Sequence, residues 1–313
     1  MARKKKKKRA LLHPFYWPIW LGAGLLRLSA NLPLPWLWQA SRLGGRLAYL
    51  MAGSRRRIVI RNLELCFPEY DRAKIMDLAR ENFQLMAFTV LTTGVNWYAS
   101  RERLDGIIHF RGKEILDTAL DAGQPVILLA PHFLGLEMCG PGIAKEGYAG
   151  VAMYQRIHNP VVDYLTRKGR GRFGTAFYER RQPILPIIRR IRQGAIFYYL
   201  PDQSPGRRHA VFVPFFGIQT ATYPTLSRFA RLARAQVIPC FSRFLPGGQG
   251  LEITFWPPLE NFPGDDLEAD TARVNRCIEE GIRRMPAQYL WAHRRFKLRP
   301  PGEPSLYEEK DRR

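Results

Sequence analysis

Short apolar runs, separated by turn residues and amphipathic stretches, dominate residues 107–300 of the sequence. Runs of four to eight apolar residues bounded by Gly, Pro or Asp predict buried strands. A short strand and turn are expected at 107–114, strands at 126–130, 150–154 and 195–200, and a hairpin from 237–244 and 251–256. Residues 211–216 are apolar and aromatic. Helical periodicity is found at 115–120, 134–143, 161–170 and 269–285. This alternation predicts an α/β fold with a mixed, mostly parallel sheet flanked by helices.

The amino-terminal hundred residues show helical patterns and no obvious chemistry. Residues 10–26 carry no charge, include two prolines, and place Phe15, Trp17 and Trp20 where a membrane interface favours aromatic rings. Residues 34–52 form an amphipathic pattern with Arg42 and Arg46 on one side. Residues 61–98 are predicted to be helical, with a break at 67–69.

We therefore predict a basic tail at 1–9, a membrane-associating helical region at 10–52 and a single α/β domain at 53–313. Basic residues lie on both sides of 10–26, so a spanning and an interfacial segment both remain open. An ordinary core helix with a basic outer face is the alternative for 34–52.

The charge of the chain indicates an anionic partner. The 49 Lys and Arg against 27 Asp and Glu give a net charge of +22. Seven of these charges lie in Arg3, Lys4 to Lys8 and Arg9, which leaves +15 for the rest. Nucleic acid, anionic lipid, a phosphorylated substrate and an acidic carrier protein all fit such a charge. The four cysteines are far apart, so neither a zinc site nor a disulfide framework is expected.

The candidate chemistry begins at the end of the strand 126–130. Pro131 ends this strand, His132 follows in the turn, and Glu137 lies five residues later in the next helix. A carboxylate on one ring nitrogen raises the basicity of the other, so we predict that Glu137 orients His132 as a general base. The alternative is a buried histidine satisfied by the backbone.

The strand at 150–154 is the expected partner of 126–130 in a parallel sheet. Two further polar residues follow predicted strands, Arg156 after 150–154 and Asp202 after 195–200. The carboxyl ends of parallel strands meet at one edge, where α/β proteins place their sites. Arg156 is a candidate to stabilise an oxyanion or hold a phosphate, and Asp202 a candidate catalytic carboxylate. A surface arginine and an ordinary turn aspartate are the alternatives.

Four sequence blocks together resemble a known family. They are Ala130-Pro131-His132-x4-Glu137, Tyr154-Gln155-Arg156 with Asn159-Pro160, Pro201-Asp202-Gln203 with 213–217, and Tyr289-Leu290-Trp291-x-His293-Arg294-Arg295-Phe296-Lys297-x-Arg299-Pro300. They are similar to the blocks of the lipid A biosynthesis lauroyl/myristoyl (late) acyltransferases, and the resemblance covers nearly the whole chain from Trp17 to Arg299. The His-x4-Asp/Glu element is shared with wider glycerolipid acyltransferases, whereas Glu137 tells against a glycerol-phosphate acyltransferase.

The resemblance implies a glycerolipid-acyltransferase-like fold and an enzyme at the bacterial inner membrane, with its catalytic domain facing the cytoplasm. The donor is expected to be an acyl carrier protein thioester, with no metal and no other cofactor. The expected acceptor is the hydroxyl of a 3-hydroxyacyl chain on a phosphorylated, Kdo-bearing lipid A precursor. The residues expected to bind these anionic substrates are Arg167, Arg170, Arg207, His293, Arg294, Arg295 and Lys297.

The reaction expected from these residues is direct transfer, in which His132 deprotonates the hydroxyl and the alkoxide attacks the thioester. Three other functions remain open. They are a lysophospholipid or other lipid O-acyltransferase with the same base, a membrane-tethered nucleic-acid-binding protein, and a catalytically silent carrier- or lipid-binding protein. No nucleic acid is expected as a partner, because the chain contains no Walker A, zinc-finger or ribonucleoprotein motif.

Overall fold

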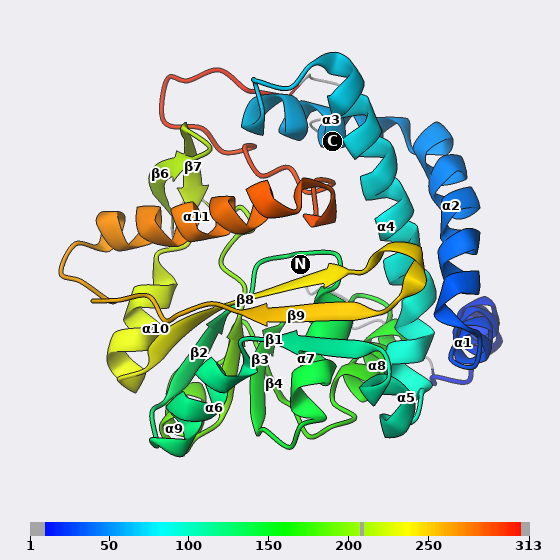
Figure 1. Cartoon of the computed structure of the whole chain (residues 1–313), viewed down its shortest axis with the longest axis horizontal. Helices are drawn as coiled ribbons and strands as arrows, with labels where there is room; N and C mark the ends of the chain where they lie inside the picture. Colours follow the sequence, from blue (N-terminus) through cyan, green and yellow to red (C-terminus); the bar gives the residue numbers. More distant parts are fainter. Residues whose placement is uncertain (1–9, 207–209, 308–313) are drawn as a thin grey trace, which may run out of the picture.

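The computed structural model describes residues 10–206 and 210–307. Seven strands form one sheet in the order β1-β9-β8-β2-β5-β3-β4, and only β8 and β9 pair in the antiparallel direction (Figure 1). The strands are β1 Ile108–Arg111, β2 Val126–Leu129, β3 Gly150–Tyr154, β4 Ala176–Glu179, β5 Ile196–Tyr199, β8 Gln236–Phe244 and β9 Leu251–Phe255. The predicted mixed, mostly parallel sheet is confirmed. A separate antiparallel hairpin joins β6 Val211–Phe215 to β7 Ile218–Thr222.

The order of the sheet corrects one detail of the sequence interpretation. We expected the strand at 150–154 to pair with the strand at 126–130, but β5 lies between β2 and β3 and pairs in parallel with both. The carboxyl end of β2 therefore has that of β5 as its neighbour, which brings the loops after these two strands together. All four residues of β2 are at most 1% exposed, because helices cover both faces of the sheet at this strand.

The helices account for most of the remaining chain. They are α1 Trp17–Ser29, α2 Leu34–Met51, α3 Gly53–Cys66, α4 Arg72–Tyr98, α5 Arg101–Asp105, α6 Lys113–Asp121, α7 Leu136–Ala144, α8 Pro160–Arg170, α9 Leu185–Arg192, α10 Thr225–Ala233 and α11 Leu267–Arg284. Short 3-10 turns are η1 Pro14–Tyr16, η3 Pro246–Gly248 and η4 Pro286–Gln288. The sequence interpretation missed β4, β6, β7, α5, α9 and α10. The predicted break at 67–69 is confirmed, since α3 ends at Cys66 and the Asp71 side chain caps α4 by accepting from the Lys74 N–H at 2.8 Å.

Alternating side chains of β5 show how the two faces of the sheet are covered. Phe197 and Tyr199 pack on Phe229 of α10. Ile196 and Tyr198 point the other way and line a pocket together with residues of α7. Helix α7, with α8 packed beside it, thus lies on one face, and α10, with α9 packed beside it, lies on the opposite one.

Helices α1, α2 and α4 lie along one side of the molecule, on the right in Figure 1, and α3 lies at the top. Helix α2 packs along α4, and its Leu34 and Leu37 belong to the main hydrophobic core. Tyr16, which ends η1, packs in a smaller cluster with Val161 and Leu165 of α8. Within residues 10–206 and 210–307, no helix is both long enough and apolar enough to cross a membrane.

The packing of α11 on β8 makes one stability prediction. A Cβ atom at Gly281 would lie 2.2 Å from the ring of Phe241, and that ring packs at 5.6 Å on Phe133, the residue after His132. Gly281→Ala should lower the free energy of unfolding by about 1–3 kcal/mol through overpacking. Gly44→Ala in α2 is the matched control, because its nearest atom would be at 3.7 Å. Urea unfolding of both variants checks this, and equal stability of Gly281→Ala and wild type would contradict it.

Candidate active site

The carboxyl ends of β2 and β5 bring His132 and Asp202 into direct contact. The His132 ring Nδ1 lies 2.7 Å from Asp202 Oδ1, and the His132 backbone N–H donates to Oδ2 at 2.8 Å. The Tyr289 hydroxyl donates a further hydrogen bond to this carboxylate, which is only 1% exposed. Asp202 is thus a buried carboxylate whose two oxygens are held by the histidine loop.

The charge state of Asp202 sets the tautomer of His132. Burial raises the pKa of the Asp202 carboxyl, but the nearby His132 and its hydrogen bonds outweigh burial and hold this pKa at about 2. An ionised carboxylate only accepts hydrogen bonds, so Nδ1 of His132 carries the proton and Nε2 presents its lone pair. A base oriented in this way can take a proton from a hydroxyl.

The partner of Glu137 differs from the one that the sequence predicted. Arg170 Nε donates to Glu137 Oε2 at 2.9 Å, and the terminal guanidinium nitrogen of Arg170 contacts the other carboxylate oxygen. Among the described residues, no hydrogen bond joins Glu137 to His132. The prediction that Glu137 orients the imidazole is therefore wrong, because α7 begins only at Leu136 and directs Glu137 toward α8, whereas Asp202 occupies Nδ1.

The ion pair between Glu137 and Arg170 is a two-point contact on a wall of the pocket. Burial lowers the pKa of the Arg170 guanidinium, but the Glu137 carboxylate raises it by more, so the net shift is upward. Arg170 was predicted to bind substrate, and it does line the pocket. Its guanidinium is already paired, so it positions Glu137 in that wall.

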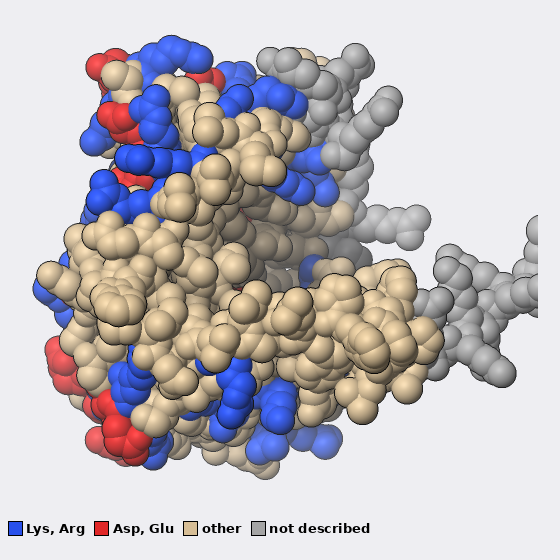
Figure 2. All heavy atoms as spheres, turned by 90° about the vertical axis from the view of Figure 1, so that its right-hand side faces the viewer, with Lys and Arg blue, Asp and Glu red and all other residues tan. Residues whose placement is uncertain are grey.

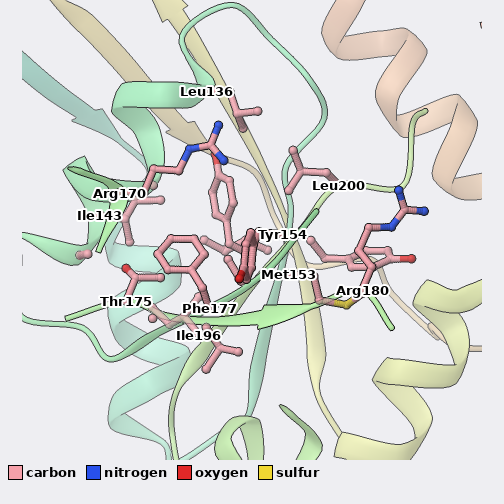
Figure 3. Close-up of a pocket in the computed structure, with 18 of the residues that line it drawn as sticks. Leu136, Ile143, Met153, Tyr154, Arg170, Thr175, Phe177, Arg180, Ile196 and Leu200 are labelled. Atoms are coloured by element: carbon pink, nitrogen blue, oxygen red, sulfur yellow. The ribbon is translucent and has the colours of Figure 1, made fainter. Parts of the chain in front are cut away.

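A pocket of about 690 Å³ contains His132, Glu137 and Arg170 in its lining. Leu136, Ile143, Phe177 and Ile196 are among the apolar side chains of this lining, which passes between α7 and the strands β3 to β5. Arg170 and Arg180 lie on opposite sides of it (Figure 3). A slot with apolar walls and a few polar groups beside the base suits a long hydrocarbon chain that ends in a polar head.

The remaining predicted residues are placed as follows. Arg156 is exposed, is absent from the pocket lining and makes no hydrogen bond or ion pair with another described residue. Arg167 is exposed with its guanidinium 5.7 Å from the Tyr154 ring centroid, and Lys297 is exposed. Arg295 is only 2% exposed and donates to the Ala221 carbonyl and the Thr222 hydroxyl, so it ties the chain to β7 instead of facing a substrate. Arg294 is half-buried, and Arg207 lies outside the described residues.

The block at 289–300 has a role that the sequence did not reveal. Tyr289 pairs with Phe133 in an antiparallel bridge, the Leu290 N–H donates to the His132 carbonyl at 3.0 Å, and the Leu134 N–H donates to Gln288. The side-chain amide of Asn82 in α4 holds this block by donating to the Ala287 and Tyr289 carbonyls at 2.7 Å each. The segment therefore supports the backbone of the loop that carries His132.

Two cations at the pocket were missed by the sequence interpretation. Arg180 follows β4, and Arg228 lies in α10. Arg180 donates to the Tyr223 hydroxyl at 2.7 Å and so bridges the loop after β4 to the chain before α10. A recognised strand at 176–179 would have placed Arg180 at the same edge as His132.

Comparison with known proteins identifies the class to which this fold and site belong. The family model of bacterial lipid A biosynthesis acyltransferases matches residues 4–298. The chain belongs to this family, so it is an acyltransferase of lipid A biosynthesis. The predicted resemblance is confirmed.

Named relatives share about a third of their residues with this chain. The lipid A biosynthesis lauroyltransferase of Escherichia coli K12 is 34% identical over 310 residues, which are 98% of this chain and 100% of that protein. The myristoyltransferase of the same strain is 33% identical over 97% of this chain and 94% of its own length. The palmitoleoyltransferase of the same strain is 32% identical over 96% of this chain and 98% of its own length. The names of these three relatives contain three different acyl groups, and their sequence identities to this chain are nearly equal. Sequence identity alone therefore does not indicate which acyl group this chain transfers.

His293 gives a prediction for the pH dependence of stability. Its Nε2 accepts from the Ser204 N–H at 3.1 Å, beside Asp202. Burial, opposed by Asp202, lowers the His293 pKa from 6.5 to about 4. Between these values the unfolded chain binds the proton and the folded chain does not, so stability falls as the pH decreases from about 6.5 to about 4.

The free energy of unfolding should fall by on the order of 3 kcal/mol across this window, because each pKa unit corresponds to about 1.36 kcal/mol. His293→Gln keeps an acceptor for Ser204 and does not titrate, so its free energy of unfolding should depend less on pH there. Asp202 does not interfere, because its pKa of about 2 places its effect below pH 3.8. Urea unfolding at several pH values measures both proteins, and identical pH profiles would refute the assignment.

Proposed function

We propose that the protein transfers a lauroyl- or myristoyl-type chain from acyl carrier protein to the 3-hydroxyacyl hydroxyl of a phosphorylated, Kdo-bearing lipid A precursor. The observation that carries this proposal is the buried Asp202 on Nδ1 of His132, with the imidazole at the wall of a largely apolar pocket. The positive charge of the chain suits both an acidic carrier and a phosphorylated acceptor.

In the proposed reaction, Nε2 of His132 removes the proton from the acceptor hydroxyl. The resulting alkoxide oxygen forms a bond to the acyl carbon, and the carbon–sulfur bond breaks. The carrier thiolate leaves and receives the proton from the imidazolium, which returns His132 to its neutral state. Asp202 stabilises the imidazolium in between, as a carboxylate does in other histidine bases. The chemistry balances without a metal or a further cofactor.

The other residues of the pocket divide the remaining tasks in this proposal. The apolar walls near Ile143 and Phe177 hold the acyl chain. The pair of Glu137 and Arg170 fixes the side of the pocket next to the base. Arg180 and Arg228 are the cations at the exposed end, where an anionic group of either substrate would lie. The exposed position of Arg156, outside the pocket lining, does not support its predicted role in stabilising an oxyanion.

The test is transfer of labelled lauroyl and myristoyl groups from acyl carrier protein to the tetra-acylated precursor by purified protein. His132→Ala should lower kcat at least 10²-fold, the usual contribution of a general base. Asp202→Asn should cost a similar factor, because an amide does not select the Nδ1–H tautomer. His109→Ala, at an exposed histidine outside the pocket, is the matched control and should stay within twofold.

The outcome with the wild type separates the competing functions. Transfer to a lysophospholipid but not to the lipid A precursor would favour the lysophospholipid acyltransferase. Absence of transfer with every acceptor would favour the catalytically silent carrier- or lipid-binding protein. Full activity of both His132→Ala and Asp202→Asn would mean that the base lies elsewhere.

We also propose that the protein lies on the cytoplasmic surface of the inner membrane through η1, α1 and α2. Large apolar side chains are exposed along these elements and on the adjacent α4: Leu12, Phe15, Trp17, Leu21, Leu25, Leu28, Leu32, Trp36, Leu43, Leu47, Leu50, Met51 and Val90. Uncharged side chains cover much of this side, and Lys and Arg lie along its borders (Figure 2). An apolar surface with basic borders suits an anionic bilayer interface.

A single charge on this surface should weaken membrane binding. Leu43 in α2 is 64% exposed, so Leu43→Glu should reduce partitioning onto vesicles that contain phosphatidylglycerol by on the order of tenfold. Leu267→Glu is the control, because Leu267 is an exposed leucine (44%) at the start of α11. Co-sedimentation measures both, and an equal effect of the two substitutions would exclude α2 as the contact.

A further inference from the structure

Helix α9 and the loop before it form a strongly basic surface next to the pocket. Residues 180–193 contain five arginines and no aspartate or glutamate: Arg180, Arg181, Arg189, Arg190 and Arg192. No carboxylate of the described residues forms a salt bridge with any of the five. Within the described residues, no carboxylate therefore neutralises these arginines, and the surface keeps its full positive charge.

The spacing along α9 gives this surface a defined direction. Leu185, Arg189 and Arg192 are four and three residues apart, so they project from one face of the helix. Arg192 donates to the Leu232 carbonyl of α10 at 3.1 Å, which places this face alongside α10. Leu185 is 60% exposed at the amino-terminal end of the same face. We call Arg181, Leu185, Arg189, Arg192 and the neighbouring Arg228 of α10 the α9–α10 basic face.

The α9–α10 basic face is continuous with the exposed end of the pocket. Arg228 belongs to the face and lines the pocket, while Ile184 and Arg180, which also line the pocket, lie next to Leu185 and Arg181 in the chain. Arg180 and Arg228 are both exposed, so the pocket reaches the molecular surface at this point. A molecule bound to the face therefore lies beside the exposed end of the slot.

We propose that the α9–α10 basic face docks the acidic carrier protein that delivers the acyl thioester, an inference that rests on the proposed function. Arginines around one exposed leucine match a partner with acidic side chains around a small apolar patch. A bilayer is the poorer match, because the exposed apolar side chains gather on α1 and α2, at the far side from α9 in Figure 1. The carrier and the membrane thus approach different sides of the enzyme.

The experiment compares two donors with the same acyl chain, lauroyl acyl carrier protein and the small thioester lauroyl-pantetheine. The test variant is Arg181→Glu/Arg189→Glu, since both side chains are exposed and neither lines the pocket. At low ionic strength the KM of the variant for the carrier donor should rise tenfold or more above that of the wild type. Added salt should reduce this difference in KM, because it screens the attraction between the arginines and the acidic carrier. The kcat/KM for lauroyl-pantetheine should stay within twofold, because the pocket is unchanged.

The matched control is Arg72→Glu/Arg80→Glu in the first half of α4, which changes the charge equally at side chains that are 77% and 58% exposed. It should leave the KM for the carrier donor within twofold. An unchanged carrier KM in the test variant would overturn the docking site. An equal loss with both donors would overturn it too, because the defect would then lie in the acyl site or the fold.

Binding measurements separate this proposal from the proposed function. If the wild type transfers the acyl group from neither donor, the proposed function is wrong. Titration of acyl carrier protein onto the wild type and the test variant then still tests whether the α9–α10 basic face binds the carrier. Weaker carrier binding by the variant would support docking, and equal binding would overturn it. Loss of binding to phosphatidylglycerol vesicles, with carrier binding unchanged, would assign the face to the membrane instead.

Discussion

The buried carboxylate of Asp202 is the constraint on which the active site depends. An ionised carboxylate that is 1% exposed is stable only when its oxygens are hydrogen-bonded, and here the donors come from His132 and Tyr289. The Asp202 carboxylate therefore has its hydrogen bonds only when three segments meet: the loop after β2, the end of β5 and the segment after η4. The order of the sheet makes this possible, since β2 and β5 are direct neighbours.

Two carboxylates near the pocket have separate tasks because their partners differ. Asp202 contacts an imidazole that can lose and regain a proton, so its negative charge acts on a group able to serve as a base. Glu137 contacts the guanidinium of Arg170, which stays protonated, so this pair is a fixed element of the pocket wall. Removing either partner of the second pair would leave a charge unpaired beside an apolar slot, and the shape of the slot would change with it.

Sequence patterns predicted most of the sheet and the residues of the site, but not how those residues pair. The run at 126–130 was recognisable because burial on both faces makes a continuous apolar strand. Strand β4 was missed because Ala176–Glu179 is half-buried at the edge of the sheet, and α9 because its arginines obscure the buried Ile187, Ile188 and Ile191. The spacing of His132 and Glu137 indicated the right pocket but the wrong hydrogen bond, since strand order is a tertiary property that local spacing does not encode. The predicted domain boundaries stay predictions.

The way in which Asn82 holds the segment at 287–289 has a consequence for biosynthesis of the protein. This amide binds carbonyls that lie 205 and 207 residues further along the chain, and Asn62 binds the Trp291 and His293 carbonyls in the same manner. A ribosome that has completed the whole sheet has still not delivered the strip of backbone that supports the loop of His132. The loop that carries His132 therefore gains this support only after residues 287–293 have been translated.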